Sequence, residues 1–540
     1  MLTLHFFVIS GISNYSISMD NYPSIFNDVM GPIMRGPSSS HCAASLRIGR
    51  LCRALMDDEL TDILIEFDPD GSLATTHKSQ GSDMGLFGGF LGWEAYEEQL
   101  RFAEDAIKGA GIQVDIKITD IKADHPNTYK ITLTNTRETR QLIAISTGGG
   151  MIEVIEIDGN QVSMGGDYYE TLIYCKPDSS LVKLIEAEVK CDEVLFHSGE
   201  HCFVEVKTQE PLDDLSCRKL LDRDDVLFIK HLPPVLPVLS RKDMKVPFIT
   251  CEEMMAYNQD KDLALWELAL HYESMRGNID QQEVWQRMEE IVDIMETSIQ
   301  DGLKGTEYDD RILGAQSVGF KEKMESNSLL GGDLSNRIIM FVSSMMEVKS
   351  SMGVIVAAPT AGSCGVIPGA LIGTAASIGL SREDVVRAML SAGIIGVFIA
   401  AHATFAAEVG GCQAECGSGS GMAAAGIVNL AGGSLAQSIC AASIALQNSL
   451  GMICDPVANR VEAPCLGKNV MAATNALSTA NMALAGYDHL IPLDEVIHTM
   501  DEVGHSIPNT LRCTSLGGLS ITKTSKEIEE RLNRRAFKSC

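Results

Sequence analysis

The chain has 540 residues, of which 45% are apolar and only 6% aromatic, and its formal net charge is −29 at pH 7. This length predicts two or three domains. The strong negative charge argues against nucleic acid or an anionic membrane as a partner, because both would repel the protein.

The fifteen cysteines do not have the regular spacing of a secreted disulfide scaffold, and their number is odd. A chain of this length does not need such cross-links, so a reducing cytoplasm is the expected location. Residues 1–10 are apolar but include no basic stretch and no clear cleavage site, so we expect no signal peptide. Met19 is an alternative start.

Residues 28–150 alternate between strand and helix patterns. Segments 63–67, 114–118 and 129–133 are rich in strand-forming residues, and the last two alternate strictly between apolar and polar. Residues 93–110 have a helical pattern. We therefore expect an α/β domain here, preceded by an N-terminal extension over residues 1–27.

A β-rich segment with one helical stretch follows at residues 151–225, which predicts a small βαβ module of the size used for regulation. Pro233, Pro234 and Pro237 then mark a linker over residues 226–249, because proline at this density excludes helix.

From residue 250 to residue 540 helical patterns dominate, with expected N-caps at Thr250, Ser381 and Thr524. Residues 388–407 are apolar and long enough to span a bilayer. This window lacks flanking aromatic belts and basic clusters, so a buried core helix is favoured over a membrane span. The predicted fold class is multidomain α+β, with an all-α C-terminal domain.

The first motif that can carry chemistry is GPSSSH at residues 36–41, just before an amphipathic stretch. Free amides at a helix start bind carboxylates, serine hydroxyls add donors, and a histidine can move protons near neutral pH. The candidates are Ser38, Ser39, Ser40 and His41. A serine-rich helix cap with a surface histidine is the alternative.

A second loop of hydroxyls and amides occupies residues 358–369, where Thr360 and Ser363 could hold the carboxylate or ammonium of an amino acid. A simple turn between helices would explain the same residues.

Cys412 follows two glycines, and Cys454 and Cys465 flank a proline-containing segment. Thiolates suit cluster iron, and three of them leave one iron open as a Lewis acid. Cys540, the last residue, could cap that iron when substrate is absent. The alternatives are buried packing cysteines, a metal pair formed by Cys412 with Cys416, and an incidental cysteine at a frayed terminus.

Five motifs in this order resemble those of the iron–sulfur L-serine dehydratases (L-serine ammonia-lyases). They are GPSSSH at 36–41, the APT loop at 358–365, GCQAE at 411–415, MAAAG at 422–426 and the segment 454–465. The resemblance implies a [4Fe–4S] cluster on Cys412, Cys454 and Cys465, and conversion of L-serine to pyruvate and ammonia. It implies beta-subunit-like, ACT-like and alpha-subunit-like parts at 28–150, 151–225 and 250–540, and a homodimer.

On this resemblance His41 and Cys540 are the expected catalytic groups, and the serines of the first motif with Thr360 and Ser363 are the expected substrate contacts. The chain departs from the family pattern at residues 42–45, directly after His41, and at Gln80, His402 and Cys513. These departures keep a related lyase acting on L-threonine, L-cysteine or a small hydroxy acid open as an alternative. A pyridoxal-phosphate dehydratase and a non-catalytic amino-acid sensor are the rival classes.

Overall fold

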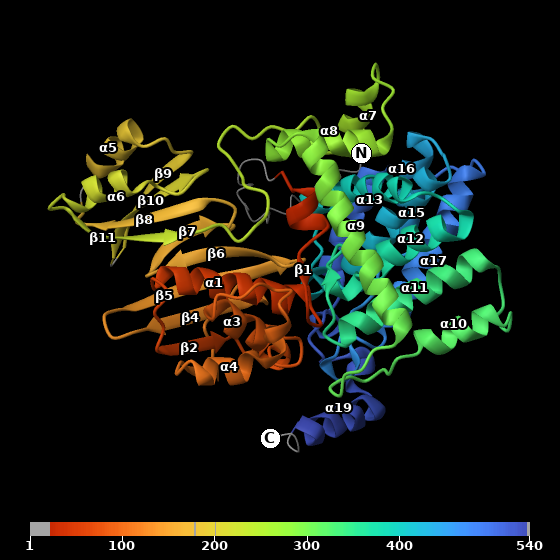
Figure 1. Cartoon of the computed structure of the whole chain (residues 1–540), viewed down its shortest axis with the longest axis horizontal. Coiled ribbons are helices and arrows are strands. Elements are labelled where there is room, and N and C mark those ends of the chain that lie inside the picture. Colours follow the sequence, from red (N-terminus) through yellow and green to blue (C-terminus); the bar gives the residue numbers. More distant parts are fainter. Residues whose placement is uncertain (1–21, 178–179, 200, 537–540) are drawn as a thin grey trace, which may run out of the picture.

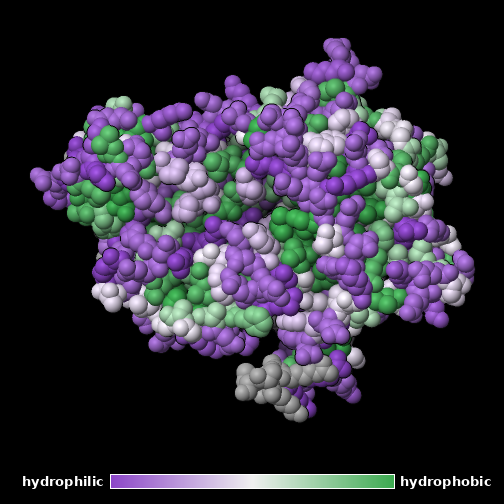
Figure 2. All heavy atoms as spheres, viewed as in Figure 1, coloured by the Kyte–Doolittle hydropathy of each residue, from purple (hydrophilic) through white to green (hydrophobic). Residues whose placement is uncertain are grey.

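The computed structural model describes residues 22–177, 180–199 and 201–536, and therefore not Met19 or Cys540. The described chain has one half built on two sheets and one half that is almost entirely helical (Figure 1). This arrangement confirms the predicted multidomain α+β class. The face seen in Figure 2 is largely hydrophilic, with apolar residues in separate patches.

The first sheet has six strands in the order β3-β2-β4-β5-β6-β7, and only β2 and β3 are parallel neighbours. The strands are β2 (Asp62–Phe67), β3 (Gln113–Ile118), β4 (Thr128–Thr134), β5 (Thr139–Gly148), β6 (Met151–Ile157) and β7 (Asn160–Met164). The helices of this part are α1 (Ala44–Leu55), α2 (Leu73–Thr76), α3 (Ser82–Phe90) and α4 (Ala103–Gly109). Helix α1 packs against β5 and β6, and α3 packs against α1 (Figure 1).

The three strands predicted in this region are confirmed as β2, β3 and β4. The helix predicted over 93–110 is wrong in its first half, since α4 begins only at Ala103 after a 3-10 turn at Glu98–Phe102. In the non-helical first half the backbone N–H of Glu94 donates to the Glu97 carboxylate at 2.9 Å, within a turn that precedes the 3-10 segment.

Helices α1 and α3 pack closely against each other at glycine residues. A Cβ added at Gly89 would lie 2.2 Å from the Leu46 carbonyl oxygen and 2.8 Å from the Gly49 Cα. These neighbours are backbone atoms, which cannot move aside as a side-chain tip can. Glycine at the contact therefore allows the two helices to approach closely, because a side chain on either helix at this point would push them apart.

We expect Gly89→Ala to destabilise the protein by about 3 kcal/mol, because overpacking forces the two helices apart. The matched control is Gly109→Ala in α4, where an added Cβ meets nothing within 4 Å. That control should be neutral or stabilising by about 0.5–1 kcal/mol, since alanine favours helix over glycine. Thermal unfolding midpoints of the two variants check the prediction, and equal midpoints would contradict it.

The second sheet is antiparallel, with the strand order β11-β8-β10-β9. Its elements are β8 (Tyr169–Cys175), α5 (Ser180–Glu188), β9 (Glu193–Ser198), β10 (Cys202–Thr208), α6 (Asp214–Leu221) and β11 (Val226–Leu232). Ile173, Val204 and Val206 form a separate core with Leu181 and Leu220 of the two helices.

The boundaries of the sheets differ from the expected segment boundaries. Strands β6 and β7 pair within the first sheet, which therefore continues past residue 150 to Met164. Strand β11 pairs with β8, so the second sheet extends into the segment expected to be linker. The prolines begin directly after β11, at Pro233.

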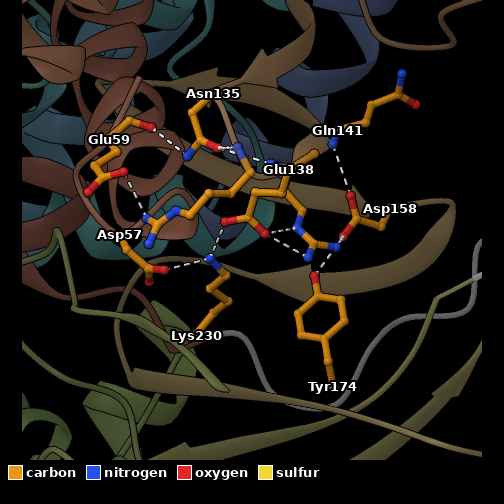
Figure 3. A network of polar contacts seen from close by, with 10 residues as sticks. Asp57, Glu59, Asn135, Glu138, Gln141, Asp158, Tyr174 and Lys230 are labelled. Atoms are coloured by element: carbon orange, nitrogen blue, oxygen red, sulfur yellow. Dashed lines mark hydrogen bonds and ion pairs between the residues drawn. The ribbon is translucent and has the colours of Figure 1, made fainter. Parts of the chain in front are cut away.

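A polar network ties the second sheet to the first (Figure 3). The Lys230 ammonium on β11 lies 2.7 Å from an Asp57 carboxylate oxygen and 2.5 Å from a Glu138 carboxylate oxygen. The Tyr174 hydroxyl on β8 donates to Asp158 at 2.7 Å. The Arg140 guanidinium also binds Asp158, and it lies 4.7 Å from the centroid of the Tyr174 ring. The second sheet is thus held against the first by ion pairs as well as by packing.

We expect Lys230→Met to lower the free energy of unfolding by about 1–3 kcal/mol. Removing one partner of a buried ion pair costs about 3–5 kcal/mol. The loss is smaller here, because Asp57 is half exposed and Glu138 retains its ion pair with Arg140. The control Lys108→Met removes an exposed pair with Glu104 and should change stability by less than about 0.5 kcal/mol. Faster amide exchange in β8 and β11 in the Lys230 variant alone is the expected signature. Unchanged amide exchange in β8 and β11 of the Lys230 variant would contradict this prediction.

The helical half contains thirteen α-helices among the described residues. They are α7 (Cys251–Asn258), α8 (Leu265–Gly277), α9 (Gln281–Lys304), α10 (Ser317–Glu325), α11 (Asp333–Ser350), α12 (Val366–Ile378), α13 (Arg382–His402), α14 (Ala407–Gly410), α15 (Ser418–Leu430), α16 (Leu435–Gln447), α17 (Cys465–Leu484), α18 (Leu493–Ser506) and α19 (Lys523–Ala536). The predicted caps at Thr250 and Ser381 are confirmed, because each side chain accepts the N–H three residues later.

Two stretches, Ala361–Ile378 and Arg382–His402, are long and apolar enough to cross a membrane by length and composition alone. In this fold 83% and 78% of their apolar windows are buried inside the protein. Helix α13 packs against α15 and α8. The helix expected at 388–407 is therefore a core helix of this fold, although it ends at His402.

The N-terminal segment joins the two halves. Ser24 donates through its hydroxyl to Glu273 at 2.5 Å, and the Ile25 N–H donates to the same carboxylate at 2.8 Å. Strand β1 (Ile33–Met34) then pairs with β12 (Ile355–Val356) of the helical half. This pairing brings the first motif to the second, and the Ala361 N–H donates to the Ser39 hydroxyl at 3.1 Å.

Candidate metal centre and active site

The three candidate cysteines come together although 53 residues separate the first from the last. Cys412 follows α14, and the Gln413 N–H donates to the Met452 carbonyl at 3.0 Å, which places Cys412 beside the Cys454 segment. A Cβ at Gly411 would lie 2.8 Å from the same carbonyl, so this approach requires glycine. Cys465 is the first residue of α17.

All three thiols are free and buried, with at most 5% of each residue exposed. The ligand atoms of Cys412, Cys454 and Glu415 lie within 4.8 Å of one another. Cys454 and Cys465 line one small cavity. The other lining residues are Ser38, Gln80, Gly362, Ala407, Glu408, Glu415, Pro456, Val461 and Cys513.

Two lysines, Lys349, which is buried, and Lys468, which is partly buried, place positive charge beside these thiols. The Lys468 ammonium lies 3.6 Å from the Cys412 sulfur and binds Asp455 at 2.9 Å. Burial disfavours its charged form, yet Cys412 and Asp455 raise the pKa of Lys468 above its usual value. The Lys349 ammonium donates to the Val461 carbonyl. Such charges would offset those of thiolates bound to a metal.

The donor set fits a thiolate-bound metal group. Burial raises the pKa of the Cys465 thiol, so a free thiolate there is unfavourable without a cation to bind. Soft sulfur donors select iron–sulfur clusters or zinc over magnesium or calcium. The site therefore has the chemistry that a metal or iron–sulfur cofactor needs.

His41 lies in the turn Ser39–Ala43 and is completely buried. Its Nδ1 lies 3.0 Å from the Ser38 hydroxyl and 3.5 Å from a Glu408 carboxylate oxygen, and its Nε2 lies 2.8 Å from the Thr76 hydroxyl. Burial, followed by the nearby His77, lowers the pKa of His41 to about 3. Because the folded-state pKa is depressed, His41 contributes stability that is present at neutral pH and lost as the pH falls from about 6.5 towards 3. His41 is thus a neutral imidazole in the folded protein.

Of the other predicted substrate contacts, some line the cavity and some lie in the loops behind it. Ser38 lines the cavity, whereas the Ser39 hydroxyl accepts the Ala361 N–H and Ser40 is buried in the same turn. Thr360 donates to Glu415 at 2.7 Å and shares a contact of 3.1 Å with the Ser363 hydroxyl. These two hydroxyls orient a carboxylate of the protein.

Glu408 is, with Glu415, one of two acidic residues of this cavity that were not singled out from the sequence. It is 4% exposed, and its Oε2 has no hydrogen-bond partner among the described residues. Burial, with a contribution from the charge of Glu415, raises the pKa of Glu408 to about 7. A carboxylate with this pKa can take and release a proton near neutral pH. In the sequence, the one feature that pointed to Glu408 was its position four residues before Cys412.

Comparison with known proteins identifies the family. Residues 260–520 match the family of the serine dehydratase alpha chain. The L-serine dehydratase alpha chain of Peptoniphilus asaccharolyticus is 37% identical over 282 residues, which are 52% of this chain and 96% of that one. A Bacillus subtilis protein named "Probable L-serine dehydratase, alpha chain" is 38% identical over 285 residues, covering 53% of this chain and 95% of that one. The chain belongs to the L-serine dehydratase family.

A beta-chain relative also matches. The "Probable L-serine dehydratase, beta chain" of Bacillus subtilis is 38% identical over 152 residues, which are 28% of this chain and 68% of that one. This L-serine dehydratase family member therefore carries, in one polypeptide, stretches similar to both chains.

Two of the four departures from the family pattern, Gln80 and Cys513, line the cavity. The Gln80 side-chain amide donates to the Cys513 sulfur at 3.6 Å, although 433 positions separate the two residues. His402 is different, because its Nε2 faces the Ile249 carbonyl at 3.1 Å and it does not line this cavity. The sequence showed that Gln80 and Cys513 are unusual but could not show that they are neighbours.

Proposed function

We propose that this protein is an iron–sulfur L-serine ammonia-lyase, which converts L-serine to pyruvate and ammonia. The observation that carries the proposal is the single buried cavity shared by two of the three family cysteines, the Ser38 hydroxyl and the Glu408 carboxylate. Family membership supports the same reaction.

Cys412, Cys454 and Cys465 are the proposed ligands of a [4Fe–4S] cluster. When bound, the cluster supplies a Lewis-acidic iron that makes the β-hydroxyl of serine a better leaving group. Lys468 and Lys349 lie where their charges lower the cost of holding anionic sulfur in a buried site.

Glu408 is the proposed general base. It accepts the proton from Cα, the electron pair of that bond forms the Cα–Cβ double bond, and the hydroxyl leaves as water after gaining a proton. The 2-aminoacrylate product tautomerises and hydrolyses to pyruvate and ammonia. His41 is held by Ser38 and Thr76, its Nδ1 lies 3.5 Å from a Glu408 carboxylate oxygen, and it remains the second candidate for proton transfer.

Ser38 is the proposed contact of the substrate carboxylate, because it lines the cavity. Ser39 and Ser363 act behind it on loop amides and Thr360 acts on Glu415, while Ser40 is buried in the same turn as Ser39. The Gln80–Cys513 pair favours a second candidate reaction, in which the same site eliminates from L-threonine, L-cysteine or a small hydroxy acid. Cys540 as a cap and a homodimer are proposed on the family resemblance, and a cytoplasmic location on the cysteine pattern of the sequence.

The test is pyruvate and ammonia release from L-serine by anaerobically purified protein, with iron and sulfide measured on the same sample. About four irons and four sulfides per chain together with pyruvate formation support the proposal. Parallel assays with L-threonine and L-cysteine decide the substrate. A protein that binds iron but acts only on another substrate would replace serine with the second candidate. A protein without iron after reconstitution would overturn the proposed cofactor.

A further inference from the structure

A cavity of about 540 Å³ lies between the two halves of the chain and shares no lining residue with the cysteine cavity. Arg35 and Arg101 line it from the half that contains the first sheet. Helix α9, the loop after it and the segment 348–354 line it from the helical half. Pockets that hold small ligands have volumes of about 300–1,000 Å³. The cavity is therefore large enough for a small molecule that both halves would contact.

Among the described residues, the two arginines of this cavity donate to backbone carbonyls and not to carboxylates. The Arg35 guanidinium donates to the Met352 carbonyl at 2.7 Å and to the Tyr96 carbonyl at 2.8 Å. The Arg101 guanidinium donates to the same Met352 carbonyl at 3.1 Å. Burial, followed by the charge of Arg101, lowers the pKa of Arg35, while Glu98 raises it. Two like charges that share one carbonyl repel each other, and an anion beside them would offset this cost.

A third arginine, Arg311, leaves two hydroxyls of the cavity free to donate. Its guanidinium donates to the Thr306 hydroxyl at 2.8 Å and to the Ser351 hydroxyl at 2.6 Å. Both hydroxyls accept in these bonds, so each keeps its own proton for another partner. Thr306 and Ser351 both line the cavity. Guanidinium and hydroxyl groups together are the donors that hold phosphate and carboxylate oxygens.

The acidic side chains of the cavity do not cancel the charge of its arginines. Asp293 is paired with Arg382 at 2.5 Å, and Asp301 is paired with Lys304 at 2.8 Å. Glu307 is the remaining acidic residue of the lining, and it is exposed. The two lining arginines therefore outnumber the one carboxylate that has no ion-pair partner within the described part of the chain.

We propose that this cavity binds a small, doubly charged oxyanion, a phosphate ester or a dicarboxylate, through its two arginines and its two hydroxyls. The arginines come from one half and the hydroxyls from the other, so the ligand bridges the halves. Arg35 directly follows β1, whose pairing with β12 joins the halves, and a bound anion should stabilise that pairing. The site is separate from the cysteine cavity, so this inference goes beyond the proposed function.

Isothermal titration calorimetry of the full-length protein with glycerol phosphate and with succinate, at low ionic strength, tests the proposal. We expect saturable binding at one site per chain, and at least about tenfold weaker binding of acetate, which carries one charge. Arg101 is exposed, and Arg101→Met should raise the Kd at least about tenfold because it removes a charge-assisted hydrogen bond. Arg101→Lys should recover only part of the affinity, since an ammonium lacks the planar fork of a guanidinium.

The matched control is Arg241→Met, because Arg241 also donates to two backbone carbonyls and does not line the cavity. This variant should bind the probes as the wild-type protein does. Saturable binding of one probe and not of the other would support the proposal and identify the oxyanion.

No saturable binding of either probe, equal affinity for acetate, or an unchanged Kd in Arg101→Met would each overturn the proposal. If Arg101→Met does not fold, amide exchange of the wild-type protein decides, because the saturating probe should slow exchange in residues 33–35 and 353–356. Unchanged exchange there would overturn the proposal as well. Since neither measurement needs iron or turnover, failure of the proposed function leaves both results unaffected.

Discussion

Cys454→Ser should abolish the iron content of the protein and lower pyruvate release from L-serine at least about a thousandfold. Cys454 is central to the group, because its thiol contacts those of Cys412 and Cys513 and its backbone is bonded to the 511–513 loop. A serine hydroxyl is a hard donor and a poor replacement for a thiolate on cluster iron. The measurement is iron and sulfide per chain, with kcat on the same preparation.

The matched control is Cys440→Ser, since a serine hydroxyl can donate to the Tyr487 carbonyl as the Cys440 thiol does. We expect wild-type iron content and kcat for this variant. Full iron content and normal turnover in Cys454→Ser would mean that another set of residues holds the cofactor.

Glu408→Gln should lower kcat by about 10²–10⁴-fold and leave the iron content unchanged, because it removes the general base and not a metal ligand. Burial, with a contribution from Glu415, raises the pKa of Glu408 to about 7, and a base works in its ionised form. The wild-type kcat/KM should therefore fall about tenfold per pH unit below this pKa and level off above it. The variant should lack this acidic limb.

Glu273→Gln is the matched control for that profile, since Glu273 is also buried but binds Ser24 and Ile25 and does not line the cavity. It should keep the acidic limb. If Glu408→Gln keeps both the limb and the rate, the proton acceptor is another group, and His41 becomes the first candidate to replace.

Features set by local chemistry were predictable from the sequence. Ser381 caps α13 because its hydroxyl reaches the N–H three residues later, a contact within one turn of chain. The prediction at Thr524 was wrong by two residues, since Thr522 accepts the Ser525 N–H and α19 begins at Lys523. Neighbouring hydroxyls compete for such a role, and only the tertiary setting decides between them.

Features set by contacts between distant segments were not predictable in the same way. Strands β6 and β7 were assigned to the small module, yet register with β5 places them in the first sheet. The cysteine set was found because soft metal ligands are rare and recognisable. Glu408 was missed, because a glutamate in an apolar run has no special pattern until burial beside Glu415 changes its pKa. Likewise, Gln80 and Cys513 become a pair only in the folded chain.

The central claim is that serine is dehydrated at a cluster held by Cys412, Cys454 and Cys465. The most direct test follows pyruvate release from L-serine while the cluster is removed with a chelator and rebuilt with iron and sulfide under anaerobic conditions. We predict that kcat rises and falls in proportion to the cluster content of the sample. Pyruvate formation by the iron-free protein, or a fully loaded protein that releases no pyruvate from L-serine, would contradict the account.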